Sequence, residues 1–512
     1  MEAKNNLNDN YVFAGYTTSN DGDVIGYHGP FNIPGPEGDA WIASGNSYGI
    51  AWQKCLGGSG DDGANCIIRT SDGGYAVCGW TSSHDGDFSD NQNTVYGDAW
   101  IARFDENGVL LWEKCFGGGA SASSIIEVRD EGRDLVVAGI GICDSANQID
   151  QNVWIMRVSS DGKTIRWQKC YGGTGTDRGY SIIQTKDNGF AIAGLTNSKD
   201  GDVKGYHASE SFDEWILKLD VSGNMQWQKC LGGTGNDIAN SIIETSDGGY
   251  IIAGTTTSPD GDVTGWHPSF LLIHDDAWIV KLSSSGALQW QKCFGGSGED
   301  GAYSIIQTSD GDFIMAGSTA SNDGDLTRKK NVNSNAWIVR LNDTGAIKWQ
   351  KWYGGTGGDQ AFSIIKTSDS GYVFAGSTGS NDGDVSGNHD SVLRKYGDVW
   401  VVKLDPDTGK ASVEVNFSTS FAQEYVKVYP NPSSAEVHFS AASNLSLNTI
   451  GFYDVMGRQL FPKYSLENNL VSCDVHDFPS GIYLARLGWT SGMTWRDGVY
   501  PGSFTMPFLV QH

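Results

Sequence analysis

The sequence is poor in proline, in basic residues and in long apolar runs. It has 12 prolines in 512 residues, fewer than disordered or collagen-like chains contain. No stretch approaches the roughly 20 apolar residues that cross a bilayer, so no membrane-spanning segment is predicted. Residues 1–10 also lack the basic head and apolar stretch of an export signal. We expect the true amino terminus, with such a signal, to lie upstream.

Positive charge is scarce. The chain has 35 Lys and Arg against 61 Asp and Glu, a formal net charge of −26. An acidic surface of this kind repels phosphate backbones and anionic lipid heads. Nucleic acid and membrane surfaces are therefore poor partners and neither is expected, whereas cations, neutral sugars and basic proteins remain candidates.

What is abundant points to a β protein. The 69 glycines and 18 tryptophans indicate a turn-rich chain packed by aromatic side chains. Self-similarity is the strongest signal. A strand with an Ala-Gly-like end recurs at Gly15, Gly79, Gly139, Gly194, Gly254, Gly317 and Gly376. A strand marked by tryptophan recurs at Trp41, Trp100, Trp154, Trp215, Trp278, Trp337 and Trp400.

Successive members of the tryptophan series are 54 to 63 residues apart, enough for four short strands and their turns. In the copy at 239–296, strands are predicted at 241–245, 250–255, 277–282 and 288–292. One such sheet cannot bury both of its faces, so the copies must stack around an axis. The sequence thus predicts an all-β fold: a seven-bladed β-propeller of four-stranded blades, with the tryptophans as wedges between blades.

The domain boundaries follow from the repeat. We expect the propeller at 1–410, a linker or closing strand at 411–424 and a separate domain at 425–512. The first strand of blade one looks truncated, because residues 2–10 align with it but contain poor strand formers.

Cysteine placement matters more than the odd count of nine. One repeat position holds Cys55, Cys115, Cys170, Cys230 and Cys293. Equivalent positions in different blades lie too far apart to bridge, so we expect small, buried and unoxidised side chains there. Cys66 and Cys78 form the one pair that we would test as a disulfide, because they fall on adjacent predicted strands.

Two acidic sets should share one face of the ring. The connection from the last strand of one blade to the first strand of the next, here called the crossover, contains Gly-Gly-Thr-Gly-x-Asp. These crossover aspartates form a candidate acidic binding face, namely Asp62, Asp177, Asp237, Asp300 and Asp359. Blade three breaks the series with Gly117 to Ser121.

The connection between second and third strands carries Asp-Gly-Asp in six blades, and blade three departs again. The pairs are Asp21 and Asp23, Asp85 and Asp87, Asp200 and Asp202, Asp260 and Asp262, Asp323 and Asp325, and Asp382 and Asp384. Closely spaced carboxylates suit calcium, but Asp and Gly also make turns without any metal, so no cofactor is certain. In four blades a histidine follows by five residues (His28, His207, His267 and His389), and we expect it to pack under its loop.

Two family resemblances can now be stated. Asp105 to Gly108, followed by Trp112, is similar to the tryptophan-docked blades of quinoprotein-like propellers, although no constellation for their quinone cofactor is visible. The whole repeat resembles the Asp-Gly-Gly-Tyr/Ala-Gly propeller repeats of extracellular Bacteroidetes proteins.

After residue 417 the pattern changes. Three blocks at 428–432, 450–460 and 478–484 closely resemble the C-terminal sorting domain of type IX secretion, a small Ig-like β-sandwich. The resemblance assigns the signal to Tyr429, Pro430, Asn431, Pro432, Asp454, Gly457, Arg458, Gly481 and Tyr483. It implies the type IX machinery as a partner and a location outside the cell or on the outer-membrane surface. Residues 503–511 are expected to form the last strand, after a longer insertion than the family usually has.

For function, the leading hypothesis is a binding or adhesion module whose acidic face engages a glycan or a protein. The alternatives are an extracellular polysaccharide hydrolase and a structural surface-layer spacer. Glycoside hydrolysis needs two carboxylates in unequal environments, and repetition makes these aspartates equivalent. No catalytic residues are therefore predicted, and the chain is not expected to be an enzyme.

Overall fold

The computed structural model divides the chain into two compact units, Met1–Phe417 and Ser418–His512. In the first unit the structure describes residues 2–3, 11–19, 23–28, 37–46, 49–91, 97–143, 151–207, 210–268, 274–326, 333–385, 388 and 397–415. In the second it describes 426–429, 436–441, 447–454, 459–460, 462–467, 470–476, 481–489 and 502–510. No helix among these residues is long and apolar enough to span a membrane.

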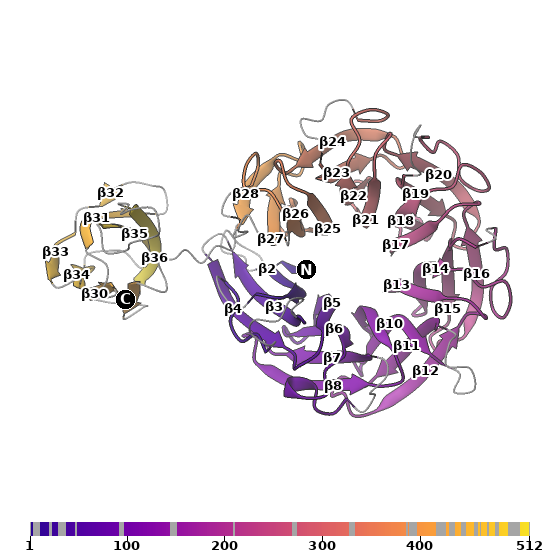
Figure 1. Cartoon of the computed structure of the whole chain (residues 1–512), viewed down its shortest axis with the longest axis horizontal. Coiled ribbons are helices and arrows are strands. Elements are labelled where there is room, and N and C mark those ends of the chain that lie inside the picture. The colour runs from indigo at the N-terminus through magenta and orange to yellow at the C-terminus, as the bar shows by residue number, and fades with distance from the viewer. Residues whose placement is uncertain are drawn as a thin grey trace. The chain divides into compact units, whose positions relative to one another are not determined.

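The first unit is a ring of seven four-stranded antiparallel sheets, as predicted (Figure 1). The first strands, nearest the centre, are β1 (Glu2–Ala3), β5 (Asp62–Arg69), β9 (Ser121–Glu127), β13 (Asp177–Gln184), β17 (Asp237–Glu244), β21 (Asp300–Gln307) and β25 (Asp359–Lys366). The second strands are β2 (Tyr11–Thr17), β6 (Tyr75–Thr81), β10 (Leu135–Ile142), β14 (Phe190–Thr196), β18 (Tyr250–Thr256), β22 (Phe313–Thr319) and β26 (Tyr372–Thr378).

The third strands carry the tryptophan series. They are β3 (Asp39–Asn46), β7 (Asp98–Phe104), β11 (Gln151–Val158), β15 (Asp213–Leu219), β19 (Asp276–Leu282), β23 (Asn335–Leu341) and β27 (Asp398–Leu404). The fourth strands, at the rim, are β4 (Gly49–Leu56), β8 (Leu110–Phe116), β12 (Ile165–Tyr171), β16 (Met225–Leu231), β20 (Leu288–Phe294), β24 (Ile347–Tyr353) and β28 (Ala411–Val415). One 3-10 turn, η1 (Gly86–Phe88), follows β6.

The ends of the ring are short strands. β1 pairs with β2 over two residues, so blade one has a first strand of minimal length. β28 pairs with β27 and completes blade seven. Of the two alternatives for residues 411–424, a linker or a closing strand, the beginning of the segment thus forms a closing strand.

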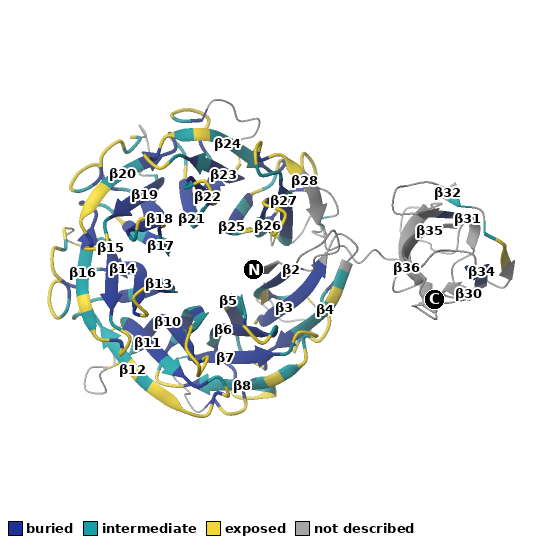
Figure 2. Cartoon of the chain, turned by 180° about the vertical axis from the view of Figure 1, so that it is seen from behind, coloured by how far each residue is buried: buried dark blue, intermediate teal, exposed yellow. Residues whose placement is uncertain are grey.

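The core lies between the blades, because second and third strands are apolar on both faces. Strands β18 and β19 are buried at every position, whereas β20 is exposed or half-buried along much of its length. Figure 2 shows this gradient from the buried middle strands to the exposed rim. Blade seven packs against blade one through Val373 and Val401 with Phe13 and Trp41, so the ring closes by side-chain packing.

Both tryptophans of the repeat are wedges, as predicted. The third-strand indoles are buried, and that of Trp278 donates a hydrogen bond to Gln291 Oε1 at 2.7 Å. In blades one to six the fourth-strand indole covers a turn glycine of the next blade. A Cβ on Gly223, whose φ is +78°, would lie 3.0 Å from Trp167 of the preceding blade. Glycine is required there both by backbone conformation and by the indole.

The disulfide prediction is wrong. Cys66 and Cys78 are directly opposite in register but are free, since directly opposed Cβ atoms are about 4.5–5.5 Å apart and a disulfide needs about 3.8 Å. The bond joins Cys143 and Cys170 instead. Cys170 is therefore oxidised, contrary to expectation, because Cys143 lies after β10 and approaches the rim strand of its own blade.

The second unit contains two four-stranded sheets, in the orders β29-β30-β34-β33 and β32-β31-β35-β36. The strands are β29 (Val426–Tyr429), β30 (Glu436–Ala441), β31 (Leu447–Asp454), β32 (Gln459–Leu460), β33 (Tyr464–Glu467), β34 (Leu470–Asp474), β35 (Gly481–Trp489) and β36 (Gly502–Val510). β36 pairs with β35 along its whole length, so the predicted last strand is confirmed. The Ig-like arrangement of the two sheets stays a prediction.

Candidate functional site

The crossover aspartates lie inside the blades. All five are at most 2% exposed. Asp177 is typical: it accepts hydrogen bonds from Ser198 Oγ at 2.7 Å, from the Gly173 amide at 2.9 Å and from Thr196 Oγ1. Carboxylates enclosed in this way cannot meet a ligand at the surface. The structure therefore gives these residues a place in the blade framework and not on an exposed acidic face.

Burial also changes the titration of these carboxyls. It raises the pKa of Asp237 to about 6, while hydrogen bonds from Thr256, Ser258 and the Gly233 amide act in the opposite direction. The pKa of Asp177 is raised for the same reason. Enclosed carboxyls of this kind are a property of the framework, repeated from blade to blade.

The Asp-Gly-Asp connections bind the crossover that lies beside them. Asp260 Oδ1 accepts a hydrogen bond from the Thr234 amide at 2.8 Å, and the Asp262 amide donates to Gly232 O at 2.8 Å. The same contacts recur in blades two, four, six and seven at Asp85, Asp87, Asp200, Asp202, Asp323, Asp325, Asp382 and Asp384. Hydrogen bonds of this kind, between an aspartate and nearby main-chain groups, are those expected if the Asp-Gly-Asp segments form turns.

Among the described residues, no three His, Cys, Asp or Glu side chains come together in a way that could hold a metal. Asp23 is buried and Asp21 lies outside the described residues. Calcium at these connections stays a prediction.

Three of the histidines bridge carboxylates of neighbouring blades. His207 Nδ1 lies 2.8 Å from Asp213 Oδ2 in its own blade, and its Nε2 lies 3.6 Å from Asp262 Oδ2 in the next. His28 and His267 make the same pair of contacts, and His389 lies outside the described residues. Each of the three thus lies between two acids, with His28 and His207 exposed and His267 half-buried.

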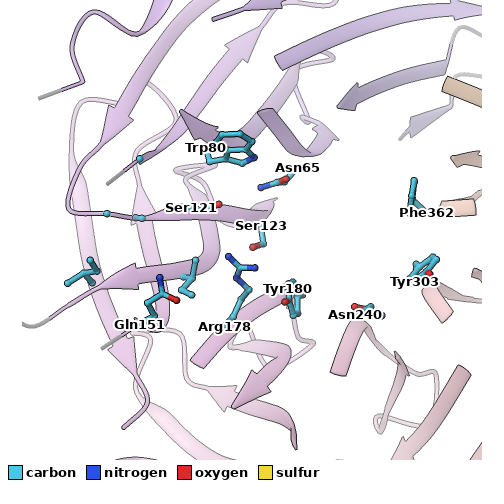
Figure 3. A pocket seen from close by; sticks show the side chains of 15 residues that line it. Asn65, Trp80, Ser121, Ser123, Gln151, Arg178, Tyr180, Asn240, Tyr303 and Phe362 are labelled. Atoms are coloured by element: carbon cyan, nitrogen blue, oxygen red, sulfur yellow. The ribbon is translucent and has the colours of Figure 1, made fainter. Parts of the chain in front are cut away.

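Blade three lacks both the crossover aspartate and the Asp-Gly-Asp pair, and a cavity lies beside its crossover. At the position of the crossover aspartate it has Ala120, which is buried. The space is part of a cavity of about 770 Å³ near the propeller axis, here called the axial cavity. Blade three contributes Gly119, Ala120, Ser121, Ser123, Ile140, Ile142 and Gln151. Figure 3 shows the cavity with its lining side chains.

A bulge in the first strand of blades two to seven places one further residue on the axial cavity. In β13 the register shifts between Gly179 and Ser181, so Tyr180 has no partner on β14. Bulges re-aim side chains in this way. The equivalent bulged residues of the other blades also line the cavity, namely Asn65, Ser123, Asn240, Tyr303 and Phe362.

The axial cavity differs in charge from the rest of the molecule. Among the described residues that line it, none is acidic and one, Arg178, is basic. The Arg178 guanidinium carbon lies 5.5 Å from the centre of the Tyr180 ring. Its Nε is buried and has no hydrogen-bond partner among the described residues. The cavity therefore combines a cation, aromatic rings and amides.

The sequence predictions missed these lining residues, although a signal existed. Framework residues repeat from blade to blade, whereas the position two residues before the Ile-Ile pair reads Asn65, Ser123, Tyr180, Asn240, Tyr303 and Phe362. The acids that repeat from blade to blade belong to the framework and therefore do not mark the ligand site. The positions that do not repeat are those that reach the axis.

The second unit agrees with the sorting-domain resemblance. Asp454 ends β31 and pairs with Tyr483 of β35, while Tyr429 ends β29 and Gly481 begins β35. Pro430, Asn431, Pro432, Gly457 and Arg458 lie outside the described residues. Residues 427–496 match the family model of the secretion system C-terminal sorting domain.

The chain is a β-propeller with a type IX secretion sorting domain. Such a domain directs export to the cell surface or the extracellular space through the type IX machinery. The localisation, the machinery as a partner and the propeller with its sorting tail are thus as predicted.

Matches to other proteins are weak. An uncharacterized WD repeat-containing protein of Acanthamoeba polyphaga mimivirus is 22% identical over 265 residues, 44% of this chain, and the chain covers 19% of its length. A protein of unknown function from Bacteroides caccae is 13% identical, with a TM-score of 0.34, over 62% of this chain and 89% of that one.

Two propeller enzymes are also structurally similar. Quinohemoprotein alcohol dehydrogenase from Comamonas testosteroni is 10% identical, with a TM-score of 0.37, over 88% of this chain and 74% of the enzyme. Puromycin hydrolase is 10% identical, with a TM-score of 0.40, over 83% of this chain and 58% of the enzyme. At this level of similarity the enzymes' activities do not transfer.

Proposed function

We propose that this exported propeller is an extracellular binding module and that its ligand, a glycan or a segment of protein, binds in the axial cavity. The observation that carries the proposal is the division between repeated and non-repeated residues. Repeated side chains are enclosed in the framework, while the non-repeated ones line the cavity. Recognition is commonly placed on variable positions of a rigid scaffold.

The size and lining of the cavity support this proposal. A volume of about 770 Å³ lies within the range of about 300–1,000 Å³ for ligand sites. Phe362 is 49% exposed, and its ring centre lies 5.6 Å from that of Tyr303. Exposed aromatic rings on a rigid wall are suited to contact a ligand.

The test is binding of the purified full-length chain to a glycan array and to labelled outer-membrane and extracellular proteins, comparing wild type with Phe362→Ala and Tyr303→Ala. We expect each variant to lose at least tenfold in affinity for any ligand found. Leu111→Ala is the matched control, because Leu111 is 56% exposed on β8 at the rim. Equal loss in the control, or no bound ligand at all, would contradict the proposal.

Hydrolysis has no comparable support in this cavity. A glycoside hydrolase needs two carboxyl groups about 5–10 Å apart. The described residues that line the cavity include no Asp or Glu. Binding without turnover is therefore the function that the lining supports.

A further inference from the structure

We propose that the axial cavity binds a carboxylate-bearing sugar unit, such as a uronic acid of an acidic polysaccharide, with Arg178 holding the carboxylate. This inference rests on the proposed binding function and specifies its ligand.

Charge makes Arg178 unusual. In a chain with a net charge of −26, the buried basic side chains are paired with acids, for example Lys218 with Asp187 at 2.8 Å and Arg103 with Asp72 at 2.7 Å. Among the described residues Arg178 has no acidic partner. Arg178 is half-buried, but its Nε is enclosed without a hydrogen-bond partner among the described residues, and an enclosed polar group without a partner costs free energy. An anionic ligand group would supply that partner.

The position of the Arg178 guanidinium also suits recognition of a planar carboxylate. Arg178 precedes the β13 bulge and lies over the Tyr180 ring. Figure 3 shows it among Ser123, Gln151 and Tyr180. An aromatic ring within about 6 Å attracts a guanidinium through a cation–π interaction, and the edge of a guanidinium matches a carboxylate with two parallel hydrogen bonds.

The rest of the lining suits a sugar ring. Asn65 and Asn240 each use Nδ2 on a main-chain carbonyl of a neighbouring blade, at 2.8 Å to Ala122 O and 3.0 Å to Ala302 O. These bonds fix the amides and leave their Oδ1 atoms as acceptors for hydroxyl groups. Tyr303 and Phe362 lie across the cavity from Arg178 (Figure 3) and provide apolar surface for the C–H face of a further pyranose of the same oligomer. Hydroxyl, apolar and carboxylate groups together describe a uronic acid better than a neutral sugar.

The experiment is calorimetric titration of the full-length chain with oligomers of galacturonate, glucuronate and sialate, each compared with its methyl ester. The ester removes the charge and preserves the sugar. At least one acid should bind wild type tenfold or more tightly than its ester. Arg178→Gln should abolish this ratio, and Arg178→Lys should retain part of it, with raised salt weakening only the acid.

The outcomes separate this inference from the binding function. If wild type binds neutral glycans and Phe362→Ala abolishes that binding, but Arg178→Gln has no effect, the carboxylate assignment fails and the binding module stands. If no acid binds, or if a peptide with a free carboxyl terminus binds through Arg178 and no sugar does, the acidic-sugar inference is wrong. If Phe362→Ala and Tyr303→Ala change no binding, the proposed function itself fails.

Discussion

Blade three and the blades around it hold their crossovers by different means. In blade four, Asp177 joins the crossover to the second strand and to the segment after it. Blade three has Ala120 at that position, a crossover two residues shorter and a disulfide from Cys143 to Cys170. The blade that lacks the hydrogen-bonded aspartate contributes seven of the fifteen residues that line the axial cavity, more than any other blade. The difference teaches that departures from the repeat, not the repeat itself, make space for a ligand.

The largest effect is expected from giving blade four the blade-three residue. Asp177→Ala leaves the donors of Gly173, Thr196 and Ser198 without their acceptor, and each bond to a buried carboxylate is worth about 1.5–3 kcal/mol. We expect a loss of about 4 kcal/mol in the free energy of unfolding, measured by guanidinium denaturation. Glu131→Ala, at an exposed turn of blade three, should leave the midpoint unchanged. A loss below about 1 kcal/mol in Asp177→Ala would contradict the structural role of the crossover aspartate.

The next effect concerns the disulfide that is specific to blade three. Cys143 and Cys170 are 27 residues apart in sequence, and closing a loop of that length stabilises by about 3 kcal/mol. We expect Cys143→Ser to lose that amount. A reducing agent should lower the melting temperature of wild type to that of the variant and leave the variant unchanged. If reduction lowers both equally, the bond does not stabilise the blade.

The smallest effect is expected at Glu214, where blade four departs from the repeat. Glu214 is fully buried and neither carboxyl oxygen has a hydrogen-bond partner among the described residues. Four other blades have alanine at this position, namely Ala40, Ala99, Ala277 and Ala336, and the remaining two have Val153 and Val399. Burial, with Asp237 and Asp213 adding to it, raises the pKa of Glu214 well above its usual value.

A raised pKa in the folded state favours folding while the group is protonated, and this contribution is lost as pH rises through the folded pKa. We therefore expect Glu214→Ala to stabilise the propeller by about 2 kcal/mol at pH 8 and by less at pH 5. Denaturation curves at the two pH values measure the difference. A variant that is less stable than wild type at both values would show that packing of the longer side chain outweighs the burial of its carboxyl group.

Much of the fold could be predicted because the repeat states it several times. The alternation in Tyr250 to Thr255, the turn after Ser246 and the tryptophan at 278 recur at nearly constant spacing, so each copy corroborates the others. The role of the crossover aspartates was not predictable in the same way. Their burial depends on hydroxyl groups such as Ser198 Oγ, which come from the following loop, and sequence does not show whether a carboxylate points to solvent or to such donors.

Sequence by itself determined the number of blades, the boundaries of the repeat, the wedge role of the tryptophans and the sorting tail, because these depend on local patterns of apolar and turn-forming residues. Tertiary structure decided which residues face the axis, which cysteine oxidises and where charge remains unpaired. Arg178 and Phe362 lie in different blades, far apart in the chain, and only closure of the ring places both on one cavity. The physical reason is that a binding site needs distances between distant segments, whereas a strand needs only its own neighbours.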